Sequence, residues 1–344
     1  GVEGMRAISE VLKVNTGLQE IDMFENTIGD EGLIAFSEAS IVNSSLQKIN
    51  LSSNQIGNNG IVAFSEALKV NKGLQVILLN DNDVKYDGVK AISDALKINT
   101  SLQKIDLSTI ELSVEEKAEV LSKWGNGVLA DLKKGTSQDH VGRALIDTVN
   151  RFDIPHEHFE AFLHSMTMDL TVQEYESYED LIEYVYGSAA VIGLEMVPIL
   201  GPLHNDAFEA AKKLGIAFQL ANFIRDVDED LDRGRVYLPL KELGQFGVTR
   251  EMLEERVLTP EIIEALKFQI ARVRQLQAEA APGIKMLETS SRPCIEAAST
   301  LYCGIVDEVE KIGYDIFNHR AKTSTARRIR VAGAAFVKRQ LISR

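Results

Sequence analysis

A period of 28 residues runs through the first third of the chain and constrains its fold more than any other feature. Leucines recur at this period, and each opens a segment of alternating apolar and polar residues, such as Leu-Gln-Lys-Ile-Asn-Leu. The repeated positions are Leu18, Leu46, Leu74 and Leu102; Asn15, Asn43, Asn71 and Asn99; Asn26, Asn54 and Asn82; and Gly32, Gly60 and Gly88. A fixed period of this length is typical of folds in which each unit packs only on its neighbours.

The alternation in each leucine segment predicts a short strand with one buried face. The periodic asparagines stand where the chain turns, and their side-chain amides can bond the backbone of neighbouring units. After each glycine, the spacing of apolar residues predicts a helix. These segments resemble leucine-rich repeats of the ribonuclease-inhibitor type. The resemblance implies an α/β solenoid over residues 1–112 that binds a protein partner, although a scaffold with no retained partner would show the same pattern.

Neither end of the repeat array carries a recognisable cap, since the first unit lacks its strand and Ile110 stands where the fourth unit should have asparagine. Solenoids usually need capping repeats for solubility. We therefore expect a fragment of a longer product or a fusion.

The 28-residue period stops at Ser113, and a different pattern follows. The capping serine and the acidic residues after it predict a helix start. Helical periodicity then predicts helices at about 115–134, 139–152, 156–167, 178–200, 205–232, 249–255, 260–288, 292–312 and 324–342. Strand signals are scarce, so we expect residues 113–344 to form an all-α domain.

One face of the predicted helix 205–232 carries the richest chemistry. Gln219, Asn222, Asp226 and Asp230 lie at i, i+3, i+7 and i+11, which places them on one side of a helix. Two carboxylates one turn apart repel each other, and a divalent cation would reverse that interaction. Oxygen donors without Cys or His favour Mg²⁺ or Mn²⁺, which also takes substrate phosphate. A solvated acidic face is the alternative.

The segment 219–239, Gln-Leu-Ala-Asn-Phe-Ile-Arg-Asp-Val-Asp-Glu-Asp-Leu-Asp-Arg-Gly-Arg-Val-Tyr-Leu-Pro, resembles the second aspartate-rich motif of the squalene/phytoene synthase family. Its ending is closer to phytoene synthases than to eukaryotic squalene synthases. Further segments agree in order, at 151–155, 168–170, 184–187, 301–308 and 313–317. The resemblance implies an isoprenoid-synthase-type helical domain. It also implies Mg²⁺-dependent, head-to-head condensation of two geranylgeranyl diphosphates to phytoene, a step of carotenoid biosynthesis.

The same resemblance implies roles for individual residues. Metal ligands would be Asn222, Asp226 and Asp230, and substrate diphosphate would contact Gln219, Asn222, Arg225, Asp226 and Arg235. Two tyrosines would be catalytic, with Tyr186 flanking the carbocation and Tyr302 in the substrate pocket, where a ring face favours a cation. Core packing is the alternative for each tyrosine. The small residues of 187–193 and 297–299 would leave room for prenyl chains, or would serve close helix packing.

The chain departs from the family pattern in one respect. The family has two facing aspartate-rich motifs, and the repeats occupy the place of the first motif and of the N-terminal helices. Because metal stabilisation of the departing diphosphate supplies several kcal/mol, we expect weakened or absent activity and exposed apolar surface on the incomplete domain. The alternative is a non-catalytic synthase-like domain carried by a leucine-rich-repeat interaction scaffold.

Composition narrows the partners and the compartment. A net charge of −14 and a pI near 5.0 disfavour nucleic acid. Two cysteines and no visible leader favour the cytoplasm. After Asp315 no acidic residue follows, whereas Arg and Lys continue to the C-terminus. That segment is a solvated basic helix, or it attracts diphosphate or an anionic membrane face. We expect a cytoplasmic protein, either free or peripheral on a membrane.

Overall fold

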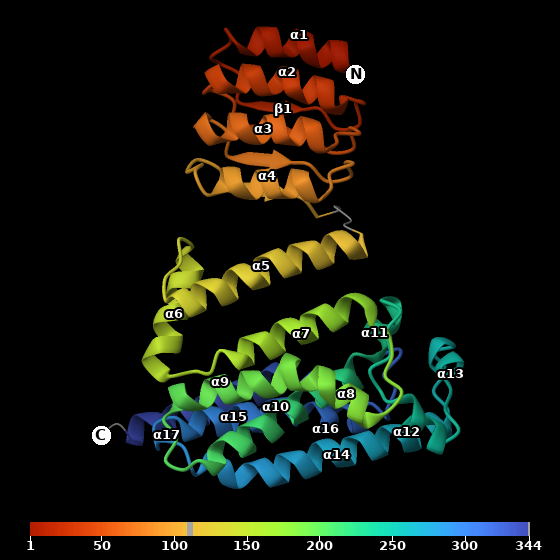
Figure 1. Ribbon diagram of the computed structural model, residues 1–344. Coiled ribbons are helices and arrows are strands. Elements are labelled where there is room, and N and C mark those ends of the chain that lie inside the picture. Colours follow the sequence, from red (N-terminus) through yellow and green to blue (C-terminus); the bar gives the residue numbers. More distant parts are fainter. Residues whose placement is uncertain (109–112, 343–344) are drawn as a thin grey trace. The chain divides into compact units, whose positions relative to one another are not determined.

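The computed structural model describes residues 1–108 and 113–342. Contacts within the chain divide it into two units, Gly1–Val120 and Leu121–Arg344 (Figure 1). The predicted boundary after residue 112 and the irregular repeat position Ile110 lie outside the described residues. The boundary at 112 therefore stays a prediction.

Helices and short strands alternate through the first unit. The order is α1 (Val2–Leu12), β1 (Glu20–Asp22), α2 (Gly29–Val42), β2 (Lys48–Asn50), α3 (Asn58–Val70), β3 (Val76–Leu78), α4 (Tyr86–Leu96) and β4 (Lys104–Asp106). The strands form one parallel sheet in chain order, and Ile21, Ile49, Ile77 and Ile105 occupy equivalent places in its register. Residues that pair on neighbouring strands are therefore 28 positions apart, which is the period of the sequence. Because each strand has three residues, the unit is mostly helical, and the expected solenoid is not clearly formed.

The periodic asparagines bond backbone groups of adjacent repeats, as predicted. Asn54 is fully buried and uses both ends of its amide. Its oxygen accepts from the backbone N–H groups of Asn26 and Ile28, and its nitrogen donates to the carbonyls of Met23 and Ser52. The amide loses its hydrogen bonds to water when it is buried in the stack. These four bonds replace them, since every polar atom of the side chain has a partner.

Helices build the second unit, and no strand is assigned among its described residues, which confirms the all-α prediction. Its elements are α5 (Val114–Lys134, which crosses the contact-based division), α6 (His140–Phe152), α7 (Glu157–Thr171), α8 (Tyr178–Val185), the π-helical turn η1 (Tyr186–Ala190), α9 (Val191–Leu200), α10 (Asp206–Arg225), α11 (Val227–Asp232), α12 (Leu240–Gln245), α13 (Arg250–Glu254), α14 (Pro260–Ile284), α15 (Arg292–Tyr302), α16 (Ile305–Lys311) and α17 (Thr325–Ile342). The predicted start of α5 is confirmed by reciprocal hydrogen bonds between Ser113 and Glu116.

Helix α10 packs against α9, η1, α14, α15 and α16. Glycines bring these backbones close together. A Cβ atom on Gly187 would lie 2.0 Å from the carbonyl oxygen of Ala161, and one on Gly215 would lie 2.6 Å from that of Ala189. Both distances are far below van der Waals contact, so close packing accounts for part of the predicted small-residue pattern.

Two helix predictions need correction, and one further helix is not predicted. The predicted helix 205–232 is two helices, because Asp226 (φ −100°, ψ 14°) leaves the helical region between α10 and α11. The predicted helix 292–312 also divides, into α15 and α16. The break falls at Gly304, where a Cβ atom would lie 2.7 Å from the guanidinium of Arg327. Helix α12 was not predicted because its 6 residues are too short to show a period.

One helical stretch among the described residues, Tyr178–Leu200, is long and apolar enough to cross a membrane. This is weak support for a membrane span, since core helices of soluble proteins have the same length and composition. The stretch contains the π-helical turn and packs on α7 and α10.

Candidate functional site

An apolar cavity of about 330 Å³ lies between α9, α10, α14 and α15. Small side chains form much of its wall, including Ala189, Gly193, Ala211 and Gly215. Two polar residues of α10, Gln219 and Asn222, also line the cavity. The predicted stripe on α10 therefore begins beside a hollow rather than in bulk solvent.

The amide of Asn222 is incompletely bonded. Its Oδ1 atom is buried, and within residues 1–108 and 113–342 no donor reaches it. A buried acceptor without a partner costs on the order of 1–3 kcal/mol. An atom in this state at the edge of a cavity is suited to accept a ligand or a cation.

The two carboxylates of the stripe follow Asn222 despite the helix break. The backbone N–H of Asp226 donates to Asn222, and that of Asp230 donates to Asp226, so the helical spacing continues. Asp230 is 8% exposed, and its burial, with the nearby Asp226 carboxylate as a second cause, raises its pKa to about 6. A bound cation would relieve this unfavourable burial of negative charge.

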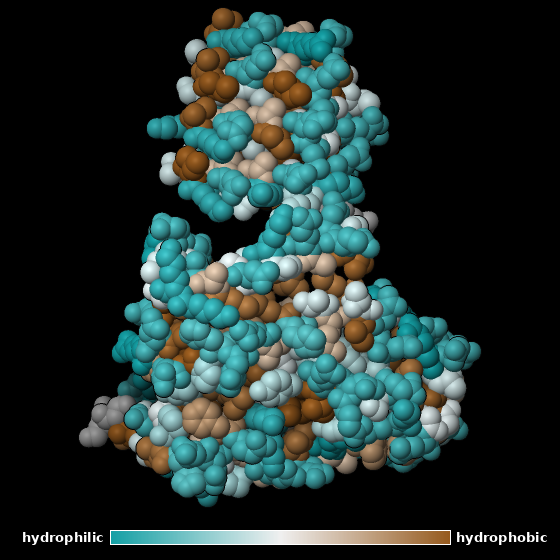
Figure 2. All heavy atoms as spheres, in the orientation of Figure 1, coloured by the Kyte–Doolittle hydropathy of each residue, from teal (hydrophilic) through white to brown (hydrophobic). Residues whose placement is uncertain are grey.

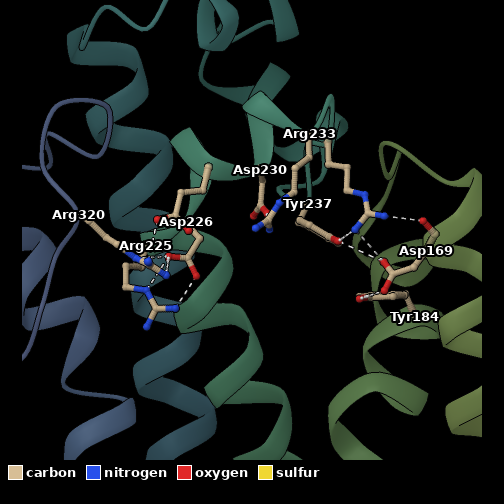
Figure 3. A network of polar contacts seen from close by, with 10 residues as sticks. Asp169, Tyr184, Arg225, Asp226, Asp230, Arg233, Tyr237 and Arg320 are labelled. Atoms are coloured by element: carbon tan, nitrogen blue, oxygen red, sulfur yellow. Dashed lines mark hydrogen bonds and ion pairs between the residues drawn. The ribbon is translucent and has the colours of Figure 1, made fainter. Parts of the chain in front are cut away.

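Two arginines hold Asp226 from different parts of the chain (Figure 3). Arg225 donates to both of its carboxylate oxygens, and Arg320 lies 3.0 Å away while also pairing with Glu229. A second hollow beside them is strongly basic, and its lining includes Arg225, Tyr302, Arg320, Lys322 and Arg328. Guanidinium groups in such a hollow can bind phosphate oxygens in pairs.

Tyr302 joins the two hollows, since it lines both of them. Its ring stacks on Phe218, another cavity residue, with 4.8 Å between ring centroids. Tyr186 does not share this place. It begins the π-helical turn, lies beside the ammonium of Lys212, and is not among the described residues that line either hollow. Its catalytic role stays a prediction without support from this geometry.

Arg235 belongs to a separate polar cluster, in which it contacts Asp169 and donates to Tyr237 at 2.9 Å. The hydroxyls of Tyr184 and Tyr237 both donate to the Asp169 carboxylate, at 3.1 and 3.2 Å. Burial raises the pKa of both tyrosines. In Figure 3, Asp230 is drawn between this cluster and the Asp226 cluster.

The structure thus brings Gln219, Asn222, Tyr302 and Arg225 to the lining of two adjoining hollows, and Arg225 pairs with Asp226. Asp226, Asp230, Tyr186 and Arg235 are not among the described residues that line these hollows. The site also includes neighbours for which the sequence predicts no role: Asp169, Tyr184, Tyr237, Phe218 and Arg320. The first three lie within segments that carry the family resemblance, and Arg320 begins the basic C-terminal segment, so signals for them were present.

The donor atoms fit a cation that is shared with substrate. Among the described residues, no group of three or more His, Cys, Asp or Glu side chains could hold a metal ion. The stripe offers the carboxylates of Asp226 and Asp230 and the unpartnered amide oxygen of Asn222, all of them oxygen donors, and both oxygens of Asp226 accept from Arg225 in this structure. Mg²⁺ commonly accepts one or two carboxylates and completes its shell with water and substrate phosphate.

An all-helical unit with an apolar cavity beside carboxylates and arginines has the architecture of an isoprenoid synthase. The family model for squalene/phytoene synthase matches residues 101–327, and the chain belongs to this family. A leucine-rich-repeat model matches residues 14–37 and 42–65, which supports the interpretation of the N-terminal repeats.

Relatives agree with this assignment. The chain is 36% identical to phytoene synthase 1, chloroplastic, of Arabidopsis thaliana over 224 residues, which is 63% of this chain and 53% of the relative. It is 35% identical to phytoene synthase 2, chloroplastic, of Solanum lycopersicum over 226 residues, or 64% of this chain and 73% of the relative. It spans little more than half the length of most of these curated relatives.

Solved structures show the same fold. A dehydrosqualene synthase in complex with ligand aligns with a TM-score of 0.59 and 28% identity, covering 65% of this chain and 78% of that one. Squalene synthase from Alicyclobacillus acidocaldarius aligns with a TM-score of 0.56 and 17% identity, covering 91% of this chain and 95% of that one. The second likeness concerns the fold alone.

Proposed function

We propose that the second unit is a phytoene synthase-like prenyltransferase domain that joins two geranylgeranyl diphosphates head to head in carotenoid biosynthesis. The observation that carries this proposal is the meeting of two hollows at Tyr302. An apolar cavity suits a prenyl tail, and a basic hollow next to it suits the diphosphate of the same substrate. Membership of the family supports the reaction class.

In this proposal each group of residues has a separate task. Arg225, Arg320 and Lys322 bind the diphosphate and remain paired with it as it leaves. The stacked rings of Phe218 and Tyr302 face the carbocation with their π surfaces. Apolar walls exclude water from it. Asn222, Asp226 and Asp230 would hold Mg²⁺ or Mn²⁺, which neutralises charge on the leaving group when it is bound.

The test is incubation of the purified chain with geranylgeranyl diphosphate and Mg²⁺, followed by extraction of a C40 hydrocarbon. We expect turnover below that of a full-length relative, because the chain lacks the first aspartate-rich motif. Asp226→Asn should lower the remaining rate about a hundredfold or more. Asp232→Asn is the matched control, since this carboxylate is exposed and pairs with Arg256. No product under conditions in which the relative turns over would reject activity for this chain.

The repeats support a second candidate, a protein-interaction scaffold that carries a synthase-like domain without turnover. Four aliphatic residues at or just after the C-terminal ends of the helices are 56% to 80% exposed and share the 28-residue period: Val14, Val42, Val70 and Ile98. Figure 2 shows hydrophobic atoms gathered along one edge of this unit. A contiguous exposed apolar ladder is typical of a protein-binding surface. In this proposal the repeats are a segment of a leucine-rich-repeat solenoid.

The two candidates differ in what is lost on mutation. Val42→Asp with Val70→Asp should abolish capture of a partner in a pull-down and leave hydrocarbon synthesis unchanged. Asp226→Asn should do the reverse. The scaffold would be favoured if the unchanged chain makes no hydrocarbon but captures a stable partner, and the double valine variant no longer captures that partner.

The compartment is open to a direct test. The plant relatives are named as chloroplastic, whereas the sequence of this chain predicts the cytoplasm. We propose the cytoplasm, and cell fractionation of the native protein would decide between the two.

A further inference from the structure

Two guanidinium groups bond the carboxylate of Asp226, and they differ in how firmly they are held. Arg225 donates from Nε to Oδ1 at 2.7 Å and from Nη2 to Oδ2. Arg320 donates from Nε to the same Oδ1 at 3.1 Å (Figure 3). The two lone pairs of Oδ1 are therefore in use. A divalent cation on this oxygen would have to displace one guanidinium, and it would be repelled by both.

Arg320 is the arginine that a ligand would displace more readily. The Arg225 side chain is 20% exposed and adjoins Asp226 in the chain, whereas the Arg320 side chain is 42% exposed. Arg320 comes from the irregular segment between α16 and α17. Phe317 and Ala321, on either side of Arg320, are buried in the core of the second unit. The backbone is thus anchored, and rotation of the exposed side chain is enough to move the guanidinium.

A second acceptor for Arg320 would lie in the basic hollow. Its side chain lines this hollow together with Lys322 and Arg328. An anion bound there would accept from the same guanidinium that reaches Asp226 and, at 2.7 Å, Glu229. Phosphate oxygens bind guanidinium groups in pairs, as carboxylates do. Arg320 therefore has two alternative partners, these two carboxylates or an anion in the hollow.

The charges around Asp226 favour two ligands together over a metal ion alone. Asp226 and Glu229 carry two negative charges, and their partners Arg225 and Arg320 carry two positive ones. Because this group of four is already balanced, a divalent cation alone adds charge that the group does not offset. A diphosphate brings negative charge and at the same time offers Arg320 another partner. Each ligand thus improves the conditions for the other.

We propose that Arg320 is a positioning residue that couples the two ligands of this site. It competes with a divalent cation for Asp226 until a diphosphate in the basic hollow takes its guanidinium. The inference rests on the proposed function for the identity of these two ligands. Coupling of this kind is reciprocal, so diphosphate binding is also stronger in the presence of the cation. Its consequence is that neither ligand is held firmly without the other.

The test measures binding of Mn²⁺ alone to the full chain, from the electron paramagnetic resonance signal of the unbound ion. Arg320→Gln should lower the dissociation constant about fivefold, because Asp226 is then free of its competitor. Adding Asp226→Asn to Arg320→Gln should abolish this gain, as expected for residues in contact. Arg256→Gln is the matched control, since it removes the same charge beside α11, where Arg256 pairs with Asp228 and Asp232. It should change the constant less than about twofold.

Three results would overturn the proposal. These are an Mn²⁺ affinity that Arg320→Gln leaves unchanged, an equal gain in Arg256→Gln, and a gain that persists beside Asp226→Asn. Mn²⁺ that no variant binds at millimolar concentration would count as the first of them. Circular dichroism at rising temperature would show that each variant keeps its fold.

Titration with inorganic pyrophosphate in the presence of EDTA tests the basic hollow separately. We expect binding that Arg320→Gln weakens about fivefold. If pyrophosphate does not bind, the proposed function loses its diphosphate site, and the coupling is lost with it. If pyrophosphate binds while Arg320→Gln leaves the Mn²⁺ affinity unchanged, the coupling alone is wrong and the proposed function stands.

Discussion

Two asparagines, one in each unit, use the same side chain in opposite ways. Asn54 in the repeats has two partners for its amide oxygen and two for its nitrogen, all of them backbone groups. Asn222 in the helical unit has a buried Oδ1 with no donor among the described residues. The first completes the internal bonding of a scaffold. Asn222 leaves a hydrogen-bond acceptor without a donor beside a cavity, which is the arrangement expected at a ligand-binding site.

The difference extends beyond this pair. Among the described residues, Oε1 of Glu195 in the helical unit is also buried without a partner, as is Oγ of Ser65 in the repeats, and burial raises the pKa of Asp230. A protein retains such costs where they serve binding or chemistry. The repeats are therefore the region to change when testing stability, and the stripe on α10 and α11 is the region to change when testing function.

The largest expected effect on the free energy of unfolding comes from replacing these two asparagines, and it tests the comparison directly. Asn54→Ala would leave two backbone N–H groups and two carbonyls inside the stack without partners, so we expect it to destabilise the first unit by about 3 kcal/mol. Asn222→Ala removes no bond to its oxygen and should change the stability of the second unit by less than about 0.5 kcal/mol. Amide hydrogen exchange resolved by peptide measures each unit separately. Equal losses in both variants would contradict the comparison.

A slightly smaller effect is expected at a close helix approach. Gly187→Ala places a Cβ atom 2.0 Å from the carbonyl oxygen of Ala161, so α7 and η1 must move apart. The expected cost is about 2–3 kcal/mol, as for other overpacked sites. In the repeats, Gly4→Ala meets no atom within 4 Å and lies in a helix, so it should be neutral or stabilising. Thermal unfolding of both variants provides the measurement, and a neutral Gly187→Ala would show that the two backbones are not held together.

These two residues also show what the sequence could predict. The period placed Asn54 in the turn between repeats and anticipated its bonds, because in a stack each unit repeats the environment of the last. At Gly187 the sequence is consistent with room for substrate and with close packing, and only the arrangement of the helices in space decides between them. Its neighbour Ala161 lies in another helix, and no local pattern encodes that approach.

The site was predicted in part for the same reason. Spacing along one helix was enough to place Gln219 and Asn222 on a common side, and both line the cavity. Spacing could not show that Arg320 would reach Asp226 across 94 residues of sequence, nor that Arg235 would turn to Asp169 instead. Contacts between helices depend on how the core packs, and that information is not local.

A pH dependence of intermediate size follows from Glu195. Burial raises the pKa of its carboxyl to about 7. Between the ordinary carboxyl range and pH 7, the folded state keeps a proton that the unfolded state has released, so stability falls as the pH rises through this window. Glu195→Gln should remove that loss and exceed the unchanged chain by about 2 kcal/mol at pH 8, with little difference at pH 4.

Denaturation by urea at both pH values, followed by amide hydrogen exchange resolved by peptide within the second unit, would test this. Glu255→Gln serves as the control, since this glutamate is exposed and its neutralisation should have no such effect. If the benefit of Glu195→Gln were the same at pH 4 and pH 8, the titration of Glu195 would not be its cause.

The smallest effect is expected on the exposed face of the sheet in the repeats. Lys48 of β2 pairs with Glu20 of β1, one period earlier, and both side chains are exposed. Because such pairs are screened by water, Lys48→Ala should cost no more than about 0.5 kcal/mol by the same exchange measurement. The next position in this row is Val76, which has no charge to pair. The row of Glu20, Lys48, Val76 and Lys104 therefore carries no repeated stabilising pair, in contrast to the asparagines. A cost several times larger would mean that the charges on the strands, like the asparagines in the turns, help to hold the stack together.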